Sequence, residues 1–522
     1  MKKLPLGIQS FSKVIKQNLL YVDKTQLIHE LINSGDYFFL SRPRRFGKSL
    51  LVSILKEIFE GNKELFKGLY IYDKHDWTPY PVIHIDFSFI TYSEGKENFH
   101  KSIQRFVRKI GKEHNVNLEG EDVKELFKDL IQKLSLKNKV VILIDEYDKP
   151  IIDHITDLVK ASENREVLRE FYSVLKGSDQ YIKFALITGI SKFAKVSVFS
   201  GLNNLEDITL DKRFNSLCGI TQEELENYFV ERIKILSKEE KKTKDKLLTK
   251  IMHWYNGYSW DGKTTLYNPF SLINLFTKNE FRNYWFETAT PTFLINLIKT
   301  KKYNITEIEK IEAGPEIFES FDIDNINLKP LLFQTGYLTI KNVIKDEITD
   351  LYRYTLSYPN FEVKESLLKY VLASFIDYDV SDIQPVYQDM LAYLKNKDIE
   401  NFMKIVKSIF AKIPYSLHIP REAYYHSIFY IILILMGAKI DAEVLTDKGR
   451  IDGVIELDDK VYVVEFKYGK SKIDMNKLLD GAVKQINDKK YYEKYLNTNK
   501  QIILLAVGFV DKKIDFKINQ PK

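Results

Sequence analysis

Short apolar runs alternate with helical patterns over the first third of the chain, and this alternation predicts a three-layer α/β domain. Four continuous apolar runs bounded by polar residues have the character of buried parallel strands; they are Tyr37–Leu40, Val82–Asp86, Val140–Ile144 and Phe184–Thr188. In Leu50–Phe59 the apolar residues recur at helical spacing, and Gly61 follows as a stop signal. Strands and helices in this order form βαβ units, which pack helices on both faces of a parallel sheet.

The pattern changes further along the chain. From about residue 221 to 276 it is helical, and the interval 280–415 is mostly helical as well. After residue 447, the segments GRIDGVIEL and VYVVEFK predict two strands joined by a turn. A charged helix over Met475–Leu496 and an apolar strand, IILLAVGF, follow. We therefore expect boundaries near residues 220, 300 and 405, with a second α/β unit at the C-terminal end.

The composition narrows the class of protein. The chain has 522 residues, of which 44% are hydrophobic and 29% charged, so large cores are expected and wholesale disorder is not. A net charge of +6 is compatible with a nucleic-acid partner but does not require one. Cys218 is the single cysteine, which rules out an internal disulfide and favours a reducing compartment.

Membrane insertion and secretion are not expected from the sequence. The longest apolar run, Ile428–Ala438, is too short to span a bilayer and predicts a buried helix. No apolar core of a signal peptide follows the N-terminal MKK. We therefore expect a cytoplasmic protein without a membrane partner.

The segment SRPRRFGKSL, which follows a predicted strand and opens a helix, indicates a phosphate-binding loop. Backbone N–H groups and a helix N-terminus at such a place bind phosphate. Lys48 would reach the β- and γ-phosphates of a nucleoside triphosphate, most simply ATP, and Ser49 would ligate Mg²⁺. The usual pattern has a glycine where this chain has Arg42, so a chance match is the alternative. The predicted nucleotide contacts of the loop are Arg45, Phe46, Gly47, Lys48, Ser49 and Leu50.

A second strand of this region ends in two acids, Asp145 and Glu146. A carboxylate at the C-terminal end of a buried strand can hold Mg²⁺, and an adjacent one can orient and deprotonate the attacking water. Asp145 could equally cap the helix that follows. Together with the phosphate loop, the two acids favour hydrolysis of the nucleotide. A third strand ends in Thr188, whose hydroxyl could sense the γ-phosphate, although threonine is also common in turns.

An arginine that contacts the γ-phosphate is expected if hydrolysis is regulated. Arg213, in DKRFNSL, is one candidate, and Arg44 and Arg45 in the loop are two more. Each of these side chains could instead be a solvated surface residue.

Asp452, Glu465 and Lys467 form a D-x12-E-x-K pattern in the C-terminal unit. Asp458 and Asp459 fit a two-residue turn. Symmetric pairing about this turn places Asp452 opposite Glu465, with Cβ atoms about 5 Å apart, and Lys467 shares the face of Glu465. Two such carboxylates repel each other unless a divalent cation lies between them. Mg²⁺ held there would polarise a phosphodiester and acidify a water, although a solvated hairpin face has the same spacing.

Several segments of the chain resemble a known family: YVDKTQLI, FLSRPRRFGKSLLVS, VVILIDEYDKPI, ALITGISKF, LCGIT, WYNGYSW and YNPFSL. They look like those of AAA-ATPase-like proteins fused to a PD-(D/E)xK nuclease-like domain. The resemblance covers Leu6 to about Leu275 and then the C-terminus, and it explains Arg42 as a feature of the family's loop. It implies an ASCE-type P-loop fold in which Glu146 is catalytic beside the magnesium-binding Asp145. It also assigns the HWYNGYSW segment to a helical or winged-helix lid.

The resemblance assigns roles in the C-terminal unit as well. Asp452 and Glu465 match the two acids of the nuclease core and would ligate the metal, and Lys467 matches its lysine. Glu422 matches a helix glutamate that precedes the hairpin. The family's acidic and lysine positions are thus all present in this sequence.

Two further positions match the family outside the hairpin. Gln485 matches a helix glutamine, and Tyr491 or Tyr492 matches a tyrosine near it. His426 lies one helical turn after Glu422 and could contact the metal or a phosphate, but a partly buried structural histidine fits the sequence equally.

These features predict an α/β protein with two enzymatic modules. We expect a P-loop ATPase core with a three-layer parallel sheet over 1–220, a helical or winged-helix lid over 221–300, a helical linker over 301–405 and a restriction-endonuclease-like domain over 406–522. ATP and Mg²⁺ are the expected cofactors, nucleic acid the expected partner, with DNA favoured over RNA, and homo-oligomers are left open. The ATPase would control cleavage. The alternatives are a nucleotide-dependent switch whose C-terminal domain binds nucleic acid or protein without cutting, and an ATPase that remodels proteins.

Overall fold

The computed structural model describes the chain outside residues 193–198, 200–201, 203, 287–293, 296, 299–304, 320–326, 377–379, 412–421, 437–438, 447–448, 471–472, 511–512 and 522. The side chains of residues 305–306, 375–376, 380–384, 422–424, 426–427, 439–446 and 449–451 also lie outside the description. The chain divides into two compact units. The first comprises Met1–Phe293 with Ile311–Val363, and the second comprises Leu294–Lys310 with Lys364–Lys522.

A five-stranded parallel sheet is the centre of the first unit, in the order β2-β3-β4-β1-β5. Its strands are β1 (Tyr37–Ser41), β2 (Val82–Asp86), β3 (Val140–Asp145), β4 (Ile182–Gly189) and β5 (Glu206–Asp207). The first four were predicted within two residues at each end. Strand β4 lies between the strand that precedes the phosphate loop and the strand that ends in two acids, the arrangement of an ASCE-type fold. The carboxyl ends of these three strands therefore meet at one edge.

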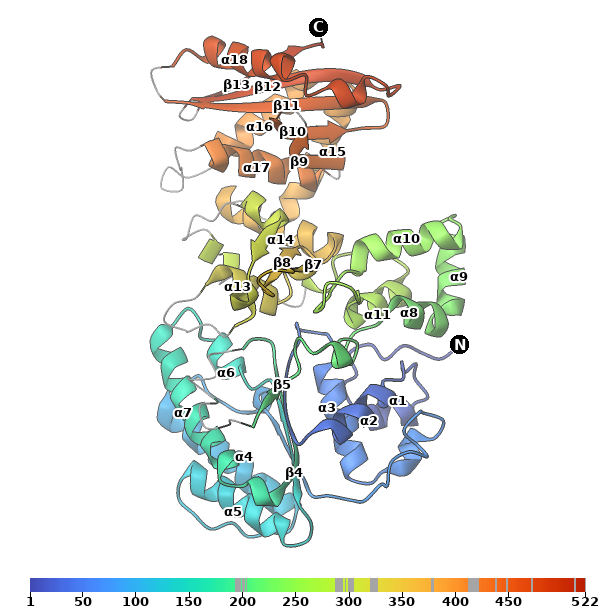
Figure 1. The fold of residues 1–522 in the computed structure, drawn as a ribbon, viewed down its shortest axis with the longest axis vertical. Coiled ribbons are helices and arrows are strands. Elements are labelled where there is room, and N and C mark those ends of the chain that lie inside the picture. The colour runs from blue at the N-terminus through green and yellow to red at the C-terminus, as the bar shows by residue number, and fades with distance from the viewer. Residues whose placement is uncertain are drawn as a thin grey trace. The chain divides into compact units, whose positions relative to one another are not determined.

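Helices cover both faces of this sheet (Figure 1). One face carries α1 (Phe11–Lys16), α2 (Thr25–Ser34) and α3 (Lys48–Phe59), and the other carries α4 (Lys96–Glu113), α5 (Val123–Ser135) and α7 (Leu158–Lys176). The three-layer α/β prediction is confirmed. Helix α3 begins two residues earlier than predicted, directly after Gly47, whose φ of 100° lies in the left-handed region that favours glycine.

Four helices occupy the described stretch from residue 222 to 278, as predicted for the interval from 221 to 276. They are α8 (Gln222–Tyr228), α9 (Val230–Glu239), α10 (Lys244–Tyr255) and α11 (Pro269–Lys278). Each contributes apolar side chains to one shared core, which includes Leu225, Leu236, Ile251 and Leu272.

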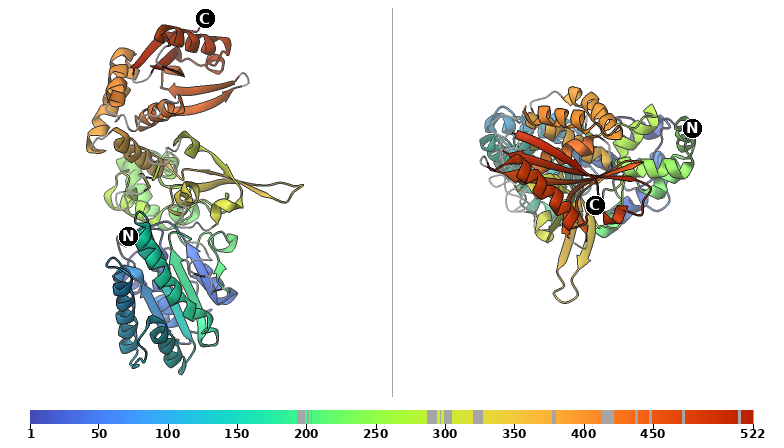
Figure 2. Two further views of the ribbon diagram at one scale, coloured as in Figure 1. Left: turned by 90° about the vertical axis from the view of Figure 1, so that its left-hand side faces the viewer. Right: turned by 90° about the horizontal axis from the view of Figure 1, so that it is seen from above.

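Contrary to the expectation of a helical linker, the interval 301–405 contains a three-stranded antiparallel sheet in the order β6-β8-β7. Its strands are β6 (Ile311–Ala313), β7 (Thr339–Lys345) and β8 (Tyr352–Ser357), and α13 (Leu328–Gln334) precedes β7. The hairpin of β7 and β8 projects from the first unit (Figure 2). Most of its outer half is exposed, so its residues lack the regular burial that produces a strand pattern in a sequence.

The second unit contains a five-stranded mixed sheet in the order β13-β12-β11-β10-β9. Its strands are β9 (Lys439–Thr446), β10 (Gly449–Glu456), β11 (Lys460–Gly469), β12 (Gln501–Val510) and β13 (Lys513–Asn519). Strands β11 and β12 are parallel, and the other neighbours are antiparallel. Strands β10, β11 and β12 were predicted, whereas the outer strands β9 and β13 were not.

Helices also cover both faces of the second sheet (Figure 1). Helix α18 (Met475–Asp488) lies on one face, and α17 (Glu422–Leu435) lies on the other. Three helices precede α17 in the chain, α14 (Phe361–Ile376), α15 (Val380–Lys395) and α16 (Ile399–Ala411). Helix α18 ends before the predicted Leu496 because Lys490 takes a φ of 48°, which no α-helix continues. Helix α17 carries most of the longest apolar run, whose prediction as a buried helix is confirmed. Among the described helices, none is both long and apolar enough to cross a bilayer.

Candidate functional site

A cavity of about 350 Å³ lies at the edge of the first sheet where β1 and β3 end. All six predicted loop residues line it: Arg45, Phe46, Gly47, Lys48, Ser49 and Leu50. Glu146 and Asp148, from the segment after β3, line it as well. The fold thus brings the phosphate loop and Glu146 to one space, whereas Asp145 and Thr188, also predicted for this site, do not line the cavity.

Lys48 is buried at the base of this loop. Its ammonium group donates hydrogen bonds to the carbonyl oxygens of Arg42 (2.9 Å) and Pro43 (3.1 Å). Burial lowers the pKa of Lys48, and the negative charges of Asp145 and Glu146 oppose this effect. The ammonium group is therefore held by neutral acceptors, close to the acids, where a phosphate could replace the carbonyls.

Asp145 and Glu146 point to different surroundings. Asp145 is 1% exposed, and its Oδ1 accepts a hydrogen bond from the Thr188 hydroxyl at 2.5 Å. Glu146 has a φ of 52°, which is uncommon outside glycine and concentrated at functional sites. Its Oε2 accepts a hydrogen bond from the Ser88 hydroxyl at 2.7 Å. Thr188 therefore contacts the predicted magnesium ligand, and Ser88, which sequence reasoning missed, contacts the predicted catalytic glutamate.

Asp148 is a second buried acid at this edge. It accepts hydrogen bonds from the backbone N–H groups of Ile190 (2.9 Å) and Ser191 (2.6 Å) and from the Ser191 hydroxyl (2.7 Å). Burial raises the pKa of Asp148, and the hydrogen bonds from Ser191 oppose this effect. A Cβ atom at Gly189 would lie 2.6 Å from the Tyr147 ring, so this close packing requires glycine. The acidic segment is thereby fixed to the end of β4.

Arg42 has a structural position. Its side chain is 1% exposed, and its guanidinium donates hydrogen bonds to the carbonyl oxygens of Ser41 (2.8 Å) and Thr209 (2.9 Å). The same group lies 4.0 Å from the centre of the Trp260 ring. Burial lowers the pKa of Arg42 to about 10. The residue that replaces the usual glycine therefore ties the base of the loop to the segment after β5 and to the WYNGYSW segment.

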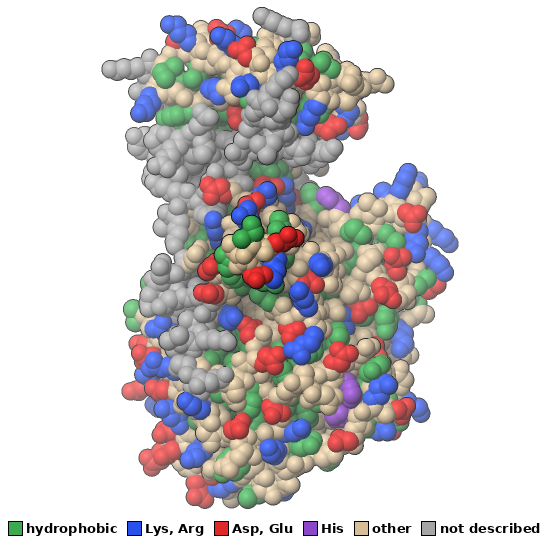
Figure 3. Space-filling view, in the orientation of Figure 1, with side chains coloured by type: hydrophobic (Ala, Val, Ile, Leu, Met, Phe, Trp, Pro, Cys, Tyr) green, Lys and Arg blue, Asp and Glu red, His purple; other side chains and the backbone are tan. Residues whose placement is uncertain are grey.

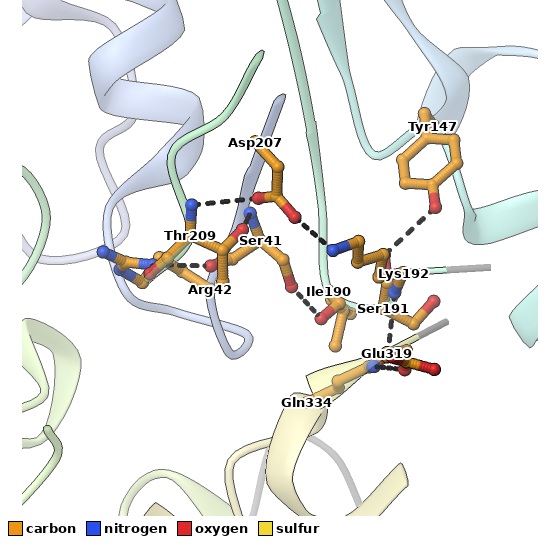
Figure 4. A network of polar contacts seen from close by, with 10 residues as sticks. All are labelled: Ser41, Arg42, Tyr147, Ile190, Ser191, Lys192, Asp207, Thr209, Glu319 and Gln334. Atoms are coloured by element: carbon orange, nitrogen blue, oxygen red, sulfur yellow. Dashed lines mark hydrogen bonds and ion pairs between the residues drawn. The ribbon is translucent and has the colours of Figure 1, made fainter. Parts of the chain in front are cut away.

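The segment after β4 connects this edge to α13 (Figure 4). The Tyr147 hydroxyl donates to the carbonyl oxygen of Ser191 at 3.1 Å. The next residue, Lys192, donates its backbone N–H to Gln334 Oε1 at 2.7 Å, and its ammonium group pairs with Asp207. One short segment thus contacts the acidic strand end, β5 and α13.

Arg213, predicted to contact the γ-phosphate, does not line the cavity. Its guanidinium pairs with Asp211 (2.5 Å) and Glu206 (2.9 Å), and its side chain is 55% exposed. The structure therefore does not bring Arg213 to the loop, whereas Arg44 and Arg45 do line the cavity.

A second, largely apolar cavity of about 100 Å³ adjoins the loop. It shares Phe46, Gly47 and Leu50 with the first cavity. Residues of the N-terminal segment, of the stretch before α8 and of α11 complete its wall, among them Leu4, Tyr21, Val22, Lys24, Cys218 and Ile273. None of these described lining residues carries a carboxylate.

In the second unit, the hairpin of β10 and β11 has the predicted register. The backbone N–H of Leu457 donates to the Lys460 carbonyl at 2.8 Å across the two-residue turn. Gly453 lies opposite Val464 at the end of the paired ladder. Continued by one residue, this register would set Asp452 opposite Glu465, but the described pairing of β10 with β11 stops before them.

Glu465 and Lys467 are in direct contact, and Asp452 bonds the backbone N–H of the residue between them. Asp452 Oδ2 accepts the backbone N–H of Phe466 at 2.8 Å, next to Glu465. Glu465 is 1% exposed, and its Oε1 lies 3.0 Å from the ammonium group of Lys467. A solvated hairpin face is therefore excluded for Glu465.

These side chains share the face of the sheet that α18 covers. Val454 and Val463 pack with Ile486 of α18 in one core. Because side chains two residues apart share a face, Asp452 and Glu465 lie on this face too. Gln485, next to Ile486 on α18, is half-buried, and Tyr491 and Tyr492 lie in the same core.

Helix α17 packs on the opposite face, through the ring pairs Phe429–Phe466 (4.9 Å) and Tyr425–Tyr468 (5.4 Å). Glu422 begins this helix, but the side chains of Glu422 and His426 lie outside the described residues.

The described part of the chain contains no group of three or more His, Cys, Asp or Glu residues arranged to hold a metal ion. Asp452 and Glu465 supply a pair of carboxylates. Mg²⁺ usually takes one or two carboxylates and completes its coordination with waters and substrate phosphates. The pair therefore fits Mg²⁺ better than an ion that needs a full protein cage.

Charges of both signs are interspersed over the visible face of the first unit (Figure 3). No broad region of one sign is apparent among the described side chains on that face. The first unit therefore does not present there the basic stripe that is typical of nucleic-acid binding.

The fold and the two sites define a P-loop ATPase-like domain and a nuclease-like domain in one chain. The family model of a predicted AAA-ATPase matches residues 5–199, and that of the PD-(D/E)XK nuclease superfamily matches residues 420–518. A relative from Azotobacter chroococcum mcd 1, described as an uncharacterized protein in the vnfD 5′ region, is 38% identical over 524 residues, covering 97% of this chain and 96% of the relative. No solved structure matches the chain. The chain belongs to the family of that relative and joins the two domains.

Proposed function

We propose that the first unit binds ATP with Mg²⁺ and hydrolyses it. The observation that carries this proposal is the convergence of Lys48 and Glu146 on one cavity, with the charge of Asp145 close enough to Lys48 to oppose the fall of its pKa. Lys48 would exchange its carbonyl acceptors for the β- and γ-phosphates, and Ser49 and Asp145 would hold Mg²⁺. Bound Mg²⁺ would neutralise charge on the phosphates.

Each remaining group of this site has a role that follows from its contacts. Glu146 lines the cavity and would orient and deprotonate the attacking water. The hydroxyl of Ser88 competes for one oxygen of Glu146 and so sets its orientation. Thr188 fixes Asp145 by its hydrogen bond, which supports a role for Thr188 in transmitting the state of the phosphate site.

The base of the nucleotide would occupy the smaller apolar cavity beside the loop. Its position next to Gly47 suits a base whose phosphates lie against the loop. Guanine presents N–H groups that a carboxylate recognises, and the described lining of this cavity offers none. Adenine is therefore the better fit.

We propose that the second unit is a metal-dependent phosphodiesterase that cleaves nucleic acid, with DNA favoured. Asp452 and Glu465 would hold Mg²⁺, which supplies Lewis acidity to the scissile phosphate. Lys467 would position the attacking water or stabilise the charge that develops on the phosphate. Gln485, half-buried on α18, would contact the nucleic-acid backbone. The sequence assigned Glu422 to the same acidic set, but its side chain lies outside the described residues.

One observation favours a different function for this unit. Glu465 and Lys467 neutralise each other at 3.0 Å, as an ion pair with a purely structural role also would. A domain that binds nucleic acid or protein without cutting would then respond to the nucleotide state of the first unit.

The test is cleavage by the purified full chain. Single- and double-stranded DNA and RNA are incubated with Mg²⁺ or Mn²⁺, beside a Glu465→Gln variant. Metal-dependent cleavage of DNA that the variant loses supports the nuclease. Retained binding with no cleavage by the native chain under either metal supports the binding alternative.

A further inference from the structure

We propose that Lys149, together with Arg44, binds the terminal phosphate of the nucleotide, so that the cavity discriminates a triphosphate from a diphosphate. This inference rests on the proposed ATP site and adds to it a residue for which the sequence patterns gave no role. Arg44 was a candidate from the sequence alone, whereas Lys149 emerges from the structure.

Both cations line the phosphate cavity and meet at one carboxylate. The ammonium group of Lys149 lies 3.1 Å from Asp153 Oδ2, and the Arg44 guanidinium lies 3.9 Å from Asp153 Oδ1. The Tyr92 hydroxyl donates a further hydrogen bond to Asp153. Asp153 thus gathers three donors, two of them charged.

Hydrogen bonds fix the backbone at both residues. The Arg44 carbonyl accepts the indole N–H of Trp285 at 3.0 Å. The Lys149 backbone N–H donates to the Glu146 carbonyl at 3.1 Å. Lys149 therefore begins its short helix within one turn of the predicted catalytic glutamate, on the cavity wall.

The other cations of the cavity are already engaged in different ways. Lys48 is held by two carbonyl oxygens at the base of the loop. The Arg45 guanidinium lies 5.1 Å from the centre of the Phe270 ring. Arg44 and Lys149 are instead part-exposed and held by an anion, which a phosphate group can replace.

Charge explains why the cavity would prefer a triphosphate to a diphosphate. A triphosphate carries an additional phosphate group, and ordinary surface ion pairs such as Lys149 with Asp153 contribute little to stability. Exchange of this weak pair for a phosphate contact costs little, and Asp153 keeps the hydrogen bond from Tyr92. A diphosphate that occupies the loop does not extend to these cations, so it does not benefit from them.

The experiment compares the affinities of ATP and ADP, each with Mg²⁺, for the full chain and for Lys149→Ala and Arg44→Ala. Affinity for ATP should fall about tenfold in each variant, whereas affinity for ADP should stay within about twofold of the native value. Lys149→Arg should recover most of the affinity for ATP. Lys160→Ala is the matched control, because Lys160 also pairs with a nearby aspartate, at 3.7 Å from Asp157, but does not line the cavity.

Three outcomes are separable. Equal losses for ATP and ADP, or no loss in Lys149→Ala, would overturn the inference while leaving the ATP site intact. Native protein that binds neither nucleotide would overturn the proposed ATP site itself. The unfolding temperature without nucleotide, measured for each variant, should match that of the native chain, and a fall in that temperature together with both affinities would assign Lys149 a structural role and contradict the inference.

Discussion

The two acidic clusters of this protein hold their charges differently. In the first unit, Asp145 and Asp148 are hydrogen-bonded by neutral donors, the side chain of Thr188 and the backbone and side chain of Ser191. The nearby Lys48 is held by carbonyl oxygens. In the second unit, Glu465 is bonded directly by Lys467.

This difference has a chemical consequence. The first site keeps its lysine and its carboxylates on separate partners, so an added phosphate and metal ion find both available. In the second site the lysine and the glutamate already neutralise each other, so a metal ion must compete with Lys467 for Glu465. Substitutions in the first site should therefore change nucleotide binding and ATP hydrolysis, whereas substitutions in the second site should change metal binding and DNA cleavage separately.

The largest effect is expected from Glu465→Gln. Loss of a metal ligand should lower DNA cleavage by about a thousandfold or more, because metal-assisted hydrolysis loses its Lewis acid. Gel-based cleavage assays with Mg²⁺ measure this. ATP hydrolysis by the same variant should stay at the native rate, and a parallel loss of both activities would contradict the separation of the two sites.

Lys48→Ala should lower ATP hydrolysis by about a hundredfold, since a buried charge-assisted contact to the phosphates is lost. Phosphate release under saturating ATP measures the rate, and nucleotide titration measures the affinity. Lys56→Ala is the matched control on the same helix, because Lys56 is 41% exposed and pairs with Glu60 at 3.8 Å. Native hydrolysis by Lys48→Ala would rule out this loop as the phosphate site.

Thr188→Val removes the hydroxyl that bonds Asp145 with little change in volume. We expect hydrolysis to fall about tenfold, because a misplaced magnesium ligand costs positioning rather than binding alone. The apparent affinity for Mg²⁺ in the hydrolysis assay should weaken in parallel. An unchanged dependence on Mg²⁺ would indicate that Thr188 has only a packing role.

Lys467→Met tests most directly whether the lysine of the second site competes with the metal ion, although its expected effect on metal affinity is the smallest of these predictions. Without the competing ammonium group, Mn²⁺ should bind the second site as tightly as in the native chain or about threefold more tightly, while cleavage is lost. Titration of Mn²⁺ by electron paramagnetic resonance, with ATP omitted, measures the affinity. Weaker metal binding would show that Lys467 supports the metal site instead of competing with it.

The sequence predicted those parts of the fold that a local pattern determines. Continuous apolar runs located four strands of the first sheet, and the two-residue turn at Asp458 and Asp459 gave the register of the hairpin, in which Gly453 pairs with Val464. The small sheet of β6, β7 and β8 was missed because β6 has only three residues and β7 and β8 are mostly exposed at their outer ends. The edge strands β9 and β13 were not predicted either.

In the candidate sites, too, the sequence predicted only what a local pattern determines. Lys48 and Glu146 could be placed together because both follow predicted strands of one parallel sheet. The roles of Arg42, Asp148 and Ser88 depend on partners far away in the sequence, such as Trp260 and Ser191, which no local pattern identifies. Arg213 was predicted to contact the γ-phosphate from its residue type alone. In the structure its guanidinium instead pairs with Glu206 and Asp211.

The central claim, a hypothesis that the two proposed sites in one chain suggest, is that nucleotide bound in the first unit governs a metal nuclease in the second. Its most direct test is the rate of DNA cleavage by the full chain, with Mg²⁺, as ATP or ADP is titrated. We predict that the native rate depends on which nucleotide is present, that Lys48→Ala abolishes this dependence while still cutting, and that Glu465→Gln does not cut. A native cleavage rate that is the same with ATP, with ADP and without nucleotide would contradict the claim.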